Sequence, residues 1–123
     1  LDPMVREELL EVFADFAAED GHAVLLSSHI VSDLERICDY IAFLHRGRLV
    51  LCEEKDVLLD TYGILKCTRE QLANIPEEAI HGKRVGAYGV EALVERELIP
   101  RGLTVDRANL EDIILYLVKE EKQ

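Results

Sequence analysis

Two short apolar runs lie close together in the first half of the chain, with one helix-sized segment between them. The first is Ala23–Leu26, and the second is Tyr40–Leu44. Wholly apolar runs of this length are typical of strands that are covered on both faces, as in parallel sheets. The order strand, helix, strand therefore predicts an α/β fold with a mainly parallel sheet.

Start and stop signals mark the helices beside these runs. Asp2 is a good N-cap and Pro3 a good first helical residue, and the apolar spacing that follows predicts a helix over about 3–19. A second helix is expected to start at Ser32. Residues 45–48 read as a tight turn. A third apolar run follows at residues 49–52, so the sequence predicts a hairpin between the second run and the third.

The second half of the chain has a weaker pattern. It predicts three units in which a strand precedes a helix, and together they form a small α+β module. The expected boundary lies near residues 54–63, which gives domains over 1–54 and 55–123. The predicted strand and helix pairs are 64–67 with 69–73, 84–88 with 90–97, and 103–105 with 109–120.

Composition excludes several classes of protein. The net charge of −11 argues against a general nucleic-acid or anionic-membrane surface. No apolar run approaches the ~20 residues that a membrane-spanning helix needs. Cys38, Cys52 and Cys67 are odd in number and have apolar neighbours, so we expect reduced thiols in the core and no disulfide framework.

Three residue groups outside the apolar runs have simple structural interpretations. The spacing of the histidines puts no two on one helix face, so no metal site is predicted. Gly82, Gly86 and Gly89 do not match a dinucleotide-binding loop and are read as turn glycines. The acidic residues of the first helix are read as a solvated face. The histidines are His22, His29, His45 and His81.

One histidine has a more suggestive position. Ser27, Ser28 and His29 directly follow the first apolar run. In an α/β sheet, the loops that leave the carboxyl ends of parallel strands line the ligand-binding crevice. His29 is therefore a candidate functional residue, although a helix-capping or packing role is also open.

The surrounding residues resemble a known family. Leu1-Asp2-Pro3, the predicted helix, the strand, Ser27-Ser28-His29 and the pattern D-x-(apolar)₄-x-x-G-R-(apolar) from Asp39 resemble the last third of the ATP-binding subunit of an ABC transporter. The resemblance covers residues 1–52 with specific motifs. The remainder is similar to the variable C-terminal extension of subunits that drive bacterial exporters, and its NLEDIILYLV resembles a common ending.

The resemblance implies a fold and roles for individual residues. The fold would be the C-terminal part of a P-loop NTPase core followed by the small α+β module. His29 would be the switch histidine that contacts the γ-phosphate of ATP, and Ser27 and Ser28 would support its loop. The D-loop would consist of Leu1, Asp2 and Pro3, with Asp2 at the interface of two nucleotide-binding domains.

The resemblance also implies cofactors, partners and a location. In the parent protein, ATP and Mg would be bound between this subunit and a second nucleotide-binding subunit, and transmembrane permease subunits would be driven by hydrolysis. Such a subunit is cytoplasmic and peripheral at the inner face of the cell membrane. The extension favours export over import, and the substrate is not indicated.

Several family motifs are absent from the sequence. None of the five lysines is followed by Ser or Thr, so there is no G-x-x-x-x-G-K-[ST] loop to cradle phosphate, and there is no L-S-G-G-Q-like signature or apolar run that ends in Asp-Glu. The sequence also starts without methionine. We therefore expect a fragment that does not hydrolyse ATP by itself and that self-associates through unpaired strand edges. The alternative is a stand-alone regulatory or protein-interaction module without a nucleotide function.

Overall fold

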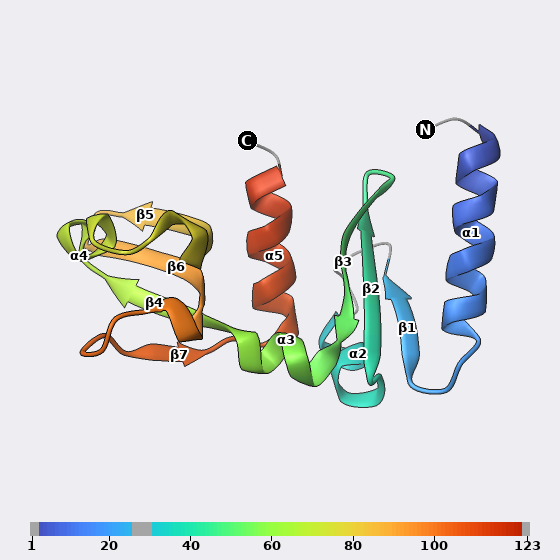
Figure 1. Cartoon of the computed structure of the whole chain (residues 1–123), viewed down its shortest axis with the longest axis horizontal. Coiled ribbons are helices and arrows are strands. Elements are labelled where there is room, and N and C mark those ends of the chain that lie inside the picture. The colour runs from blue at the N-terminus through green and yellow to red at the C-terminus, as the bar shows by residue number, and fades with distance from the viewer. Residues whose placement is uncertain (1–2, 26–30, 122–123) are drawn as a thin grey trace. The chain divides into compact units, whose positions relative to one another are not determined.

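The computed structural model describes residues 3–25 and 31–121. The chain divides into two compact units, unit 1 (Leu1–Asp56) and unit 2 (Val57–Gln123), and each is described by itself (Figure 1). Among the described helices, none combines the length and the apolar character that crossing a membrane requires. The assignment of the two ranges to an ATPase core and an extension stays a prediction.

Unit 1 alternates helices and strands. Its three strands form one sheet in the order β1-β2-β3. β1 runs parallel to β2, from the pair His22 and Tyr40 to the pair Leu25 and Phe43. Its elements are α1 (Pro3–Ala17), β1 (His22–Leu25), α2 (Val31–Ile37), β2 (Tyr40–His45) and β3 (Arg48–Glu54).

The prediction of a mainly parallel sheet is wrong. β3 runs antiparallel to β2, so this sheet contains one parallel and one antiparallel pair. Only Arg46 and Gly47 connect the two strands, with φ angles of 53° and 77°. A two-residue loop with positive φ at both positions matches the twist of an antiparallel hairpin and cannot join parallel strands. The predicted hairpin is confirmed, and so is the combination of helices and strands.

The second strand carries the core of unit 1. Ile41, Ala42 and Phe43 are buried on β2, the central strand. Gly21 ends the turn after α1 with a φ of +79°, and its carbonyl oxygen accepts hydrogen bonds from the backbone N–H groups of Asp39 and Tyr40. The start of β1 is thereby held beside the start of β2.

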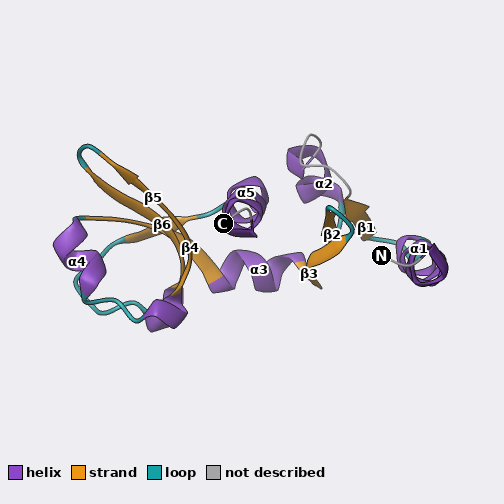
Figure 2. Ribbon diagram, turned by 90° about the horizontal axis from the view of Figure 1, so that it is seen from above, coloured by secondary structure: helices purple, strands orange, loops and turns teal. Residues whose placement is uncertain are grey.

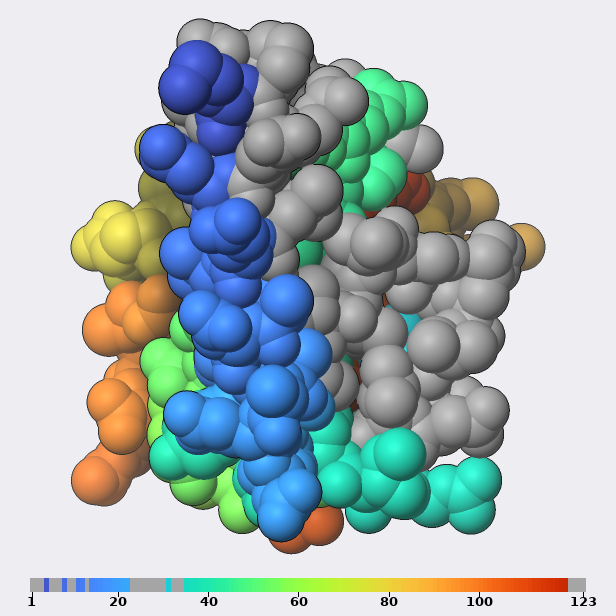
Figure 3. Space-filling model, turned by 90° about the vertical axis from the view of Figure 1, so that its right-hand side faces the viewer, coloured from blue at the N-terminus to red at the C-terminus, as the bar shows by residue number. Residues whose placement is uncertain are grey.

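The first helix lies at the surface of unit 1. Glu8, Glu11 and Asp15 are exposed, as expected for a solvated acidic face. In the space-filling view the described residues of α1 form a blue surface ridge (Figure 3). These carboxylates therefore have the ordinary role of charges on a surface helix.

Unit 2 is built on an antiparallel sheet of four strands in the order β5-β6-β4-β7. The helix α3 (Lys55–Thr61) spans the boundary between the units and leads into it. The other elements are β4 (Tyr62–Cys67), α4 (Arg69–Ala73), the 3₁₀ helix η2 (Glu77–Ala79), β5 (Ile80–Gly86), β6 (Gly89–Glu95), the 3₁₀ helix η3 (Arg96–Leu98), β7 (Val105–Arg107) and α5 (Leu110–Glu121).

The predicted helix over 90–97 is wrong, because residues 89–95 form the strand β6. Glu, Ala and Leu give this segment a helical composition. However, Val90 and the run Ala92–Val94 are buried, and β6 pairs with β5 on one side and β4 on the other. Burial in the middle of a sheet therefore overrides the intrinsic helix propensity of the segment.

Each face of this sheet carries a helix, with α4 on one side and α5 on the other (Figure 2). Leu65, Ala92 and Val94 belong to the core on the α4 face, where Leu72 packs against them. Strand alternation turns Ile64 and Leu93 to the α5 face. Both faces of the sheet are therefore packed.

The last helix begins as the sequence predicts. The Asn109 side chain accepts a hydrogen bond from the Asp112 backbone N–H at 2.7 Å, and the Asp112 carboxylate accepts one from the Asn109 N–H at 3.2 Å. This reciprocal pair is a capping box. Leu110, Ile113 and Ile114 are buried and form the apolar face of this helix.

Candidate functional site

Most of the predicted site residues lie outside the described part of the chain. These are Leu1, Asp2, Ser27, Ser28 and His29. Pro3 is the first residue of α1. The roles predicted for all six residues stay predictions.

The elements on either side of residues 26–30 are described. β1 ends at Leu25 and α2 begins at Val31, so this segment follows the carboxyl end of the parallel strand. The Lys55 ammonium donates to the Glu35 carbonyl oxygen at 2.6 Å, and the Lys55 N–H donates to the Asp39 carbonyl at 2.8 Å. These two bonds tie the α2 region to the end of β3.

The described histidines do not come together. The His22 ring packs between Phe16 and Tyr40, at centroid distances of 4.3 and 4.6 Å. His81, on β5, has its Nε2 2.7 Å from a carboxylate oxygen of Glu95 on β6. No group of three or more His, Cys, Asp or Glu side chains that could hold a metal ion occurs among the described residues.

The glycines of unit 2 are not all turn glycines. Gly86 and Gly89 flank the β5–β6 turn, and Gly89 has a φ of +151°. Gly82 instead lies within β5, buried under α5. A Cβ there would be 3.1 Å from both the Cβ and the carbonyl oxygen of Tyr116. The prediction is therefore wrong for Gly82, which is needed for close approach of a helix to the sheet.

The cysteines are all free, but only two belong to the core. Cys38 and Cys67 are buried, and burial raises the pKa of both thiols. Cys52 is exposed on β3, so the prediction of three core thiols is wrong for this residue. Alternation along β3 places it on the outer side of the strand, because its neighbour Leu51 is buried.

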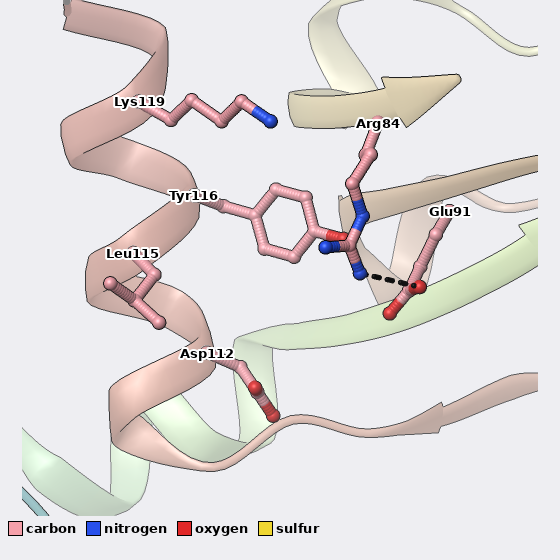
Figure 4. A pocket seen from close by; sticks show the side chains of 6 residues that line it. All are labelled: Arg84, Glu91, Asp112, Leu115, Tyr116 and Lys119. Atoms are coloured by element: carbon pink, nitrogen blue, oxygen red, sulfur yellow. Dashed lines mark hydrogen bonds and ion pairs between the residues drawn. The ribbon is translucent and has the colours of Figure 1, made fainter. Parts of the chain in front are cut away.

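A small pocket lies in unit 2 between α5 and the β5–β6 hairpin (Figure 4). Its volume is about 150 Å³. Arg84 and Glu91 face each other on the two strands, and their side chains form an ion pair of 3.2 Å. The Tyr116 ring points from the helix toward this pair (Figure 4). The lining consists of Arg84, Glu91, Asp112, Leu115, Tyr116 and Lys119.

The hydroxyl group of Tyr116 is the unusual feature of this pocket. Its oxygen is buried and makes no hydrogen bond of regular geometry with the described residues. Burial raises the pKa of Tyr116, and the negative charge of Glu91 raises it further. Sequence reasoning missed this pocket, because the residues come from three elements and β6 was read as a helix.

The chain is similar over nearly its whole length to proteins of one family. An uncharacterized ABC transporter ATP-binding protein of Synechocystis, sll0415, is 35% identical over 98% of this chain and 37% of its own length. YhcH of Bacillus subtilis, also an uncharacterized ABC transporter ATP-binding protein, is 40% identical over 97% of this chain and 39% of its own length.

A third similarity is limited to part of the chain. The lantibiotic transport ATP-binding protein SrtF of Streptococcus pyogenes is 39% identical over 46% of this chain and 24% of its own length. No protein-family model matches the sequence. The chain thus spans between a quarter and two fifths of the length of these relatives.

Proposed function

We propose a role in ATP-driven transport from one premise: the chain belongs to the family of ABC transporter ATP-binding proteins. The observation that carries the proposal is the similarity over 97% and 98% of the chain, which includes unit 2 as well as unit 1. The chain would form the part of such a subunit that contains the D-loop, the switch histidine and a C-terminal extension.

In this role, His29 contacts the γ-phosphate of ATP. Support comes from its position in the sequence, after the carboxyl end of β1, because ligands of α/β sheets bind at this edge. Phosphoryl transfer depends mainly on positioning and on stabilisation of developing charge. One imidazole N–H can donate to a phosphate oxygen that gains charge in the transition state. Ser27 and Ser28 would hold the loop through local hydrogen bonds to the backbone.

The D-loop would link two active sites. Asp2, with Leu1 and Pro3 beside it, would lie at the interface with a second nucleotide-binding subunit. Support comes from the match of these three residues to the family motif immediately before α1. Asp2 would thereby couple closure of the dimer to the state of the neighbouring site.

ATP and magnesium do not fit this chain alone. Its sequence has no phosphate-cradling loop, and its described residues include no cluster of carboxylates or histidines that could hold a metal ion. In the parent protein the phosphates and the ion would be held mainly by residues outside this chain. We therefore expect the 123-residue chain to bind ATP very weakly and not to hydrolyse it.

The partners would be a second nucleotide-binding subunit and transmembrane permease subunits at the inner face of the cell membrane. Export is favoured by the likeness of unit 2 to the extensions of subunits that drive bacterial exporters. The isolated chain would self-associate through β1, which pairs only with β2 among the described strands. A single monomeric mass by light scattering would contradict this self-association.

The decisive experiment replaces His29 by Ala in the full-length parent protein. We expect kcat for ATP hydrolysis to fall by roughly 10²–10³-fold, because one transition-state donor is lost, while ATP binding is retained. His81→Ala is the matched control, since His81 lies in unit 2 and pairs with Glu95. Unchanged hydrolysis in His29→Ala would reject the switch role. A parent gene without a phosphate loop would favour the regulatory or protein-interaction module instead.

A further inference from the structure

We propose that the pocket between α5 and the β5–β6 hairpin binds a single carboxylate group that has an apolar side chain next to it. This inference is independent of the proposed ATPase role, because it concerns unit 2 alone. The pocket volume of about 150 Å³ fits a small ligand or the end of a peptide chain.

The pocket offers donors that its own carboxylates do not fully occupy. The buried Tyr116 hydroxyl lies beside the Glu91 carboxylate but makes no hydrogen bond of regular geometry with the described residues, and a buried polar group without a well-formed hydrogen bond costs free energy. Arg84 has five N–H donors, and one nitrogen of its guanidinium donates to Glu91. Lys119 extends from α5 toward β5 at the same opening (Figure 4). A ligand that supplies acceptor oxygens would satisfy these donors.

The acidic residues of the pocket are already engaged. The Glu91 carboxylate accepts from Arg84, and the Asp112 carboxylate accepts from the Asn109 backbone N–H in the capping box. Neither is therefore positioned to recruit a cationic ligand in preference to its present partner. The donors that remain on Arg84 and Lys119 therefore favour an anionic ligand group.

The charges of the pocket select a monoanion over a dianion. Two cations, Arg84 and Lys119, face two carboxylates, Glu91 and Asp112, so the formal charges of the lining cancel. The chain as a whole carries −11. A phosphate dianion would add two negative charges to this balanced site, whereas a carboxylate adds one and matches the fork of an arginine. The chemistry thus favours a carboxylate.

An apolar neighbour of that carboxylate is indicated by Leu115. This side chain lines the pocket and is 48% exposed. An exposed leucine beside polar donors can cover an aliphatic side chain of the ligand and gain free energy from the area buried. N-acetylleucine combines both groups and represents a peptide C-terminus, and isocaproate represents a free small acid.

The test is calorimetric and NMR titration of the 123-residue chain with N-acetylleucine, isocaproate, N-acetylleucinamide and inorganic phosphate. We expect both carboxylates to bind and to shift the amide signals of residues 84, 91 and 116. N-acetylleucinamide carries a neutral amide in place of the carboxylate of N-acetylleucine. It should bind at least about tenfold more weakly, since a hydrogen bond to a charged group is lost. If N-acetylleucine binds more tightly than isocaproate, the ligand is a peptide C-terminus. If isocaproate binds more tightly, the ligand is a free small acid.

Two variants and two matched controls complete the test. Arg84→Gln and Tyr116→Phe should each weaken binding by about tenfold. Lys83→Gln removes a charge from the neighbouring exposed position of the same strand, and Tyr88→Phe removes a hydroxyl from a fully exposed tyrosine, so both should bind like the unmodified chain. Unchanged amide spectra away from the pocket would show that the variants fold.

Three results would overturn the proposal. Equal affinity for N-acetylleucine and N-acetylleucinamide would exclude recognition of the carboxylate. Tighter binding of phosphate than of either carboxylate would exclude the choice of a monoanion. Absence of binding to the unmodified chain, or equal binding by Arg84→Gln, Tyr116→Phe and their controls, would exclude the pocket as the site. None of these results depends on ATP hydrolysis.

Discussion

The sheet of unit 2 has a helix on each face, whereas the sheet of unit 1 ends at a parallel strand, β1, with β2 as its one neighbour among the described strands. Parallel strands occur almost only in sheets that are covered on both faces. An edge strand also presents unpaired N–H and C=O groups. Unit 1 therefore has a parallel strand at the edge of its sheet, whereas the sheet of unit 2 is packed on both faces.

This difference has a consequence for stability. In unit 2 the residues of the core cluster on the α4 face all lie within Val57–Gln123. Its stability should therefore respond to changes within its own core and leave unit 1 unaffected. Amide hydrogen exchange reports protection separately for the strands of each unit, so it can test this independence.

The largest effect is expected from Leu93→Ala. Leu93 is fully buried on the central strand β6, opposite Ile64. Truncation leaves a cavity, and such changes cost about 2–5 kcal/mol. Exchange protection should fall across β4, β5 and β6 and stay unchanged in β2. Leu115→Ala, at a position that is 48% exposed, is the control and should change stability by less than about 0.5 kcal/mol. Equal loss of protection in β2 would show that the two units unfold together.

A smaller effect is expected from Gly63→Ala. A Cβ at Gly63 would lie 2.9 Å from the Asp106 carbonyl oxygen on the neighbouring strand β7. The backbone must shift to admit it, so we expect a loss of about 1–3 kcal/mol in denaturant unfolding. Gly86→Ala is the matched control, because a Cβ there would be 3.7 Å from the Gly89 carbonyl oxygen, an ordinary contact distance. A Gly63→Ala variant as stable as Gly86→Ala would mean that β7 is not held as tightly as the structure indicates.

The parts of the fold that could be predicted are those specified by local sequence. The β2–β3 hairpin follows from a two-residue turn with Gly47, and the start of α5 follows from Asn109. β6 could not be predicted in this way, because its helical composition is overridden by pairing on both sides. The parallel sheet was over-predicted, because an apolar run does not reveal the direction of its neighbour.

The two candidate sites also differ in how far local sequence could predict them. His29 is a candidate from sequence because a short motif and a predicted strand end lie together in the chain. The pocket between α5 and the β5–β6 hairpin was not predicted, because Arg84, Glu91 and Tyr116 meet only through the pairing of β5 with β6 and the packing of α5 over Gly82. Its only local trace is a glycine within a strand, which marks close approach of another element.

The smallest effect is expected at alkaline pH, where unit 2 should lose more stability than unit 1. Burial raises the pKa of Tyr62 and Tyr116, both in unit 2, and the charges of Glu95 and Glu91 raise them further. A raised pKa keeps these phenols neutral in the folded state while the unfolded chain ionises near pH 10. The unfolded state then binds fewer protons, so stability is complete below about pH 9 and falls as pH rises through the range of the folded pKa values.

Denaturant unfolding followed by hydrogen exchange at about pH 8 and about pH 11 measures this loss in each unit. Unit 1 also contains a buried acid with a raised pKa, the thiol of Cys38, and Cys67 is its counterpart in unit 2. Each thiol adds a loss in the same direction to its own unit, and the two tyrosines add a further loss in unit 2. Tyr62→Phe with Tyr116→Phe should remove that excess, whereas Tyr88→Phe, at a fully exposed tyrosine, should retain it. An equal pH dependence in both units would mean that the phenols are as accessible to water in the folded chain as in the unfolded one.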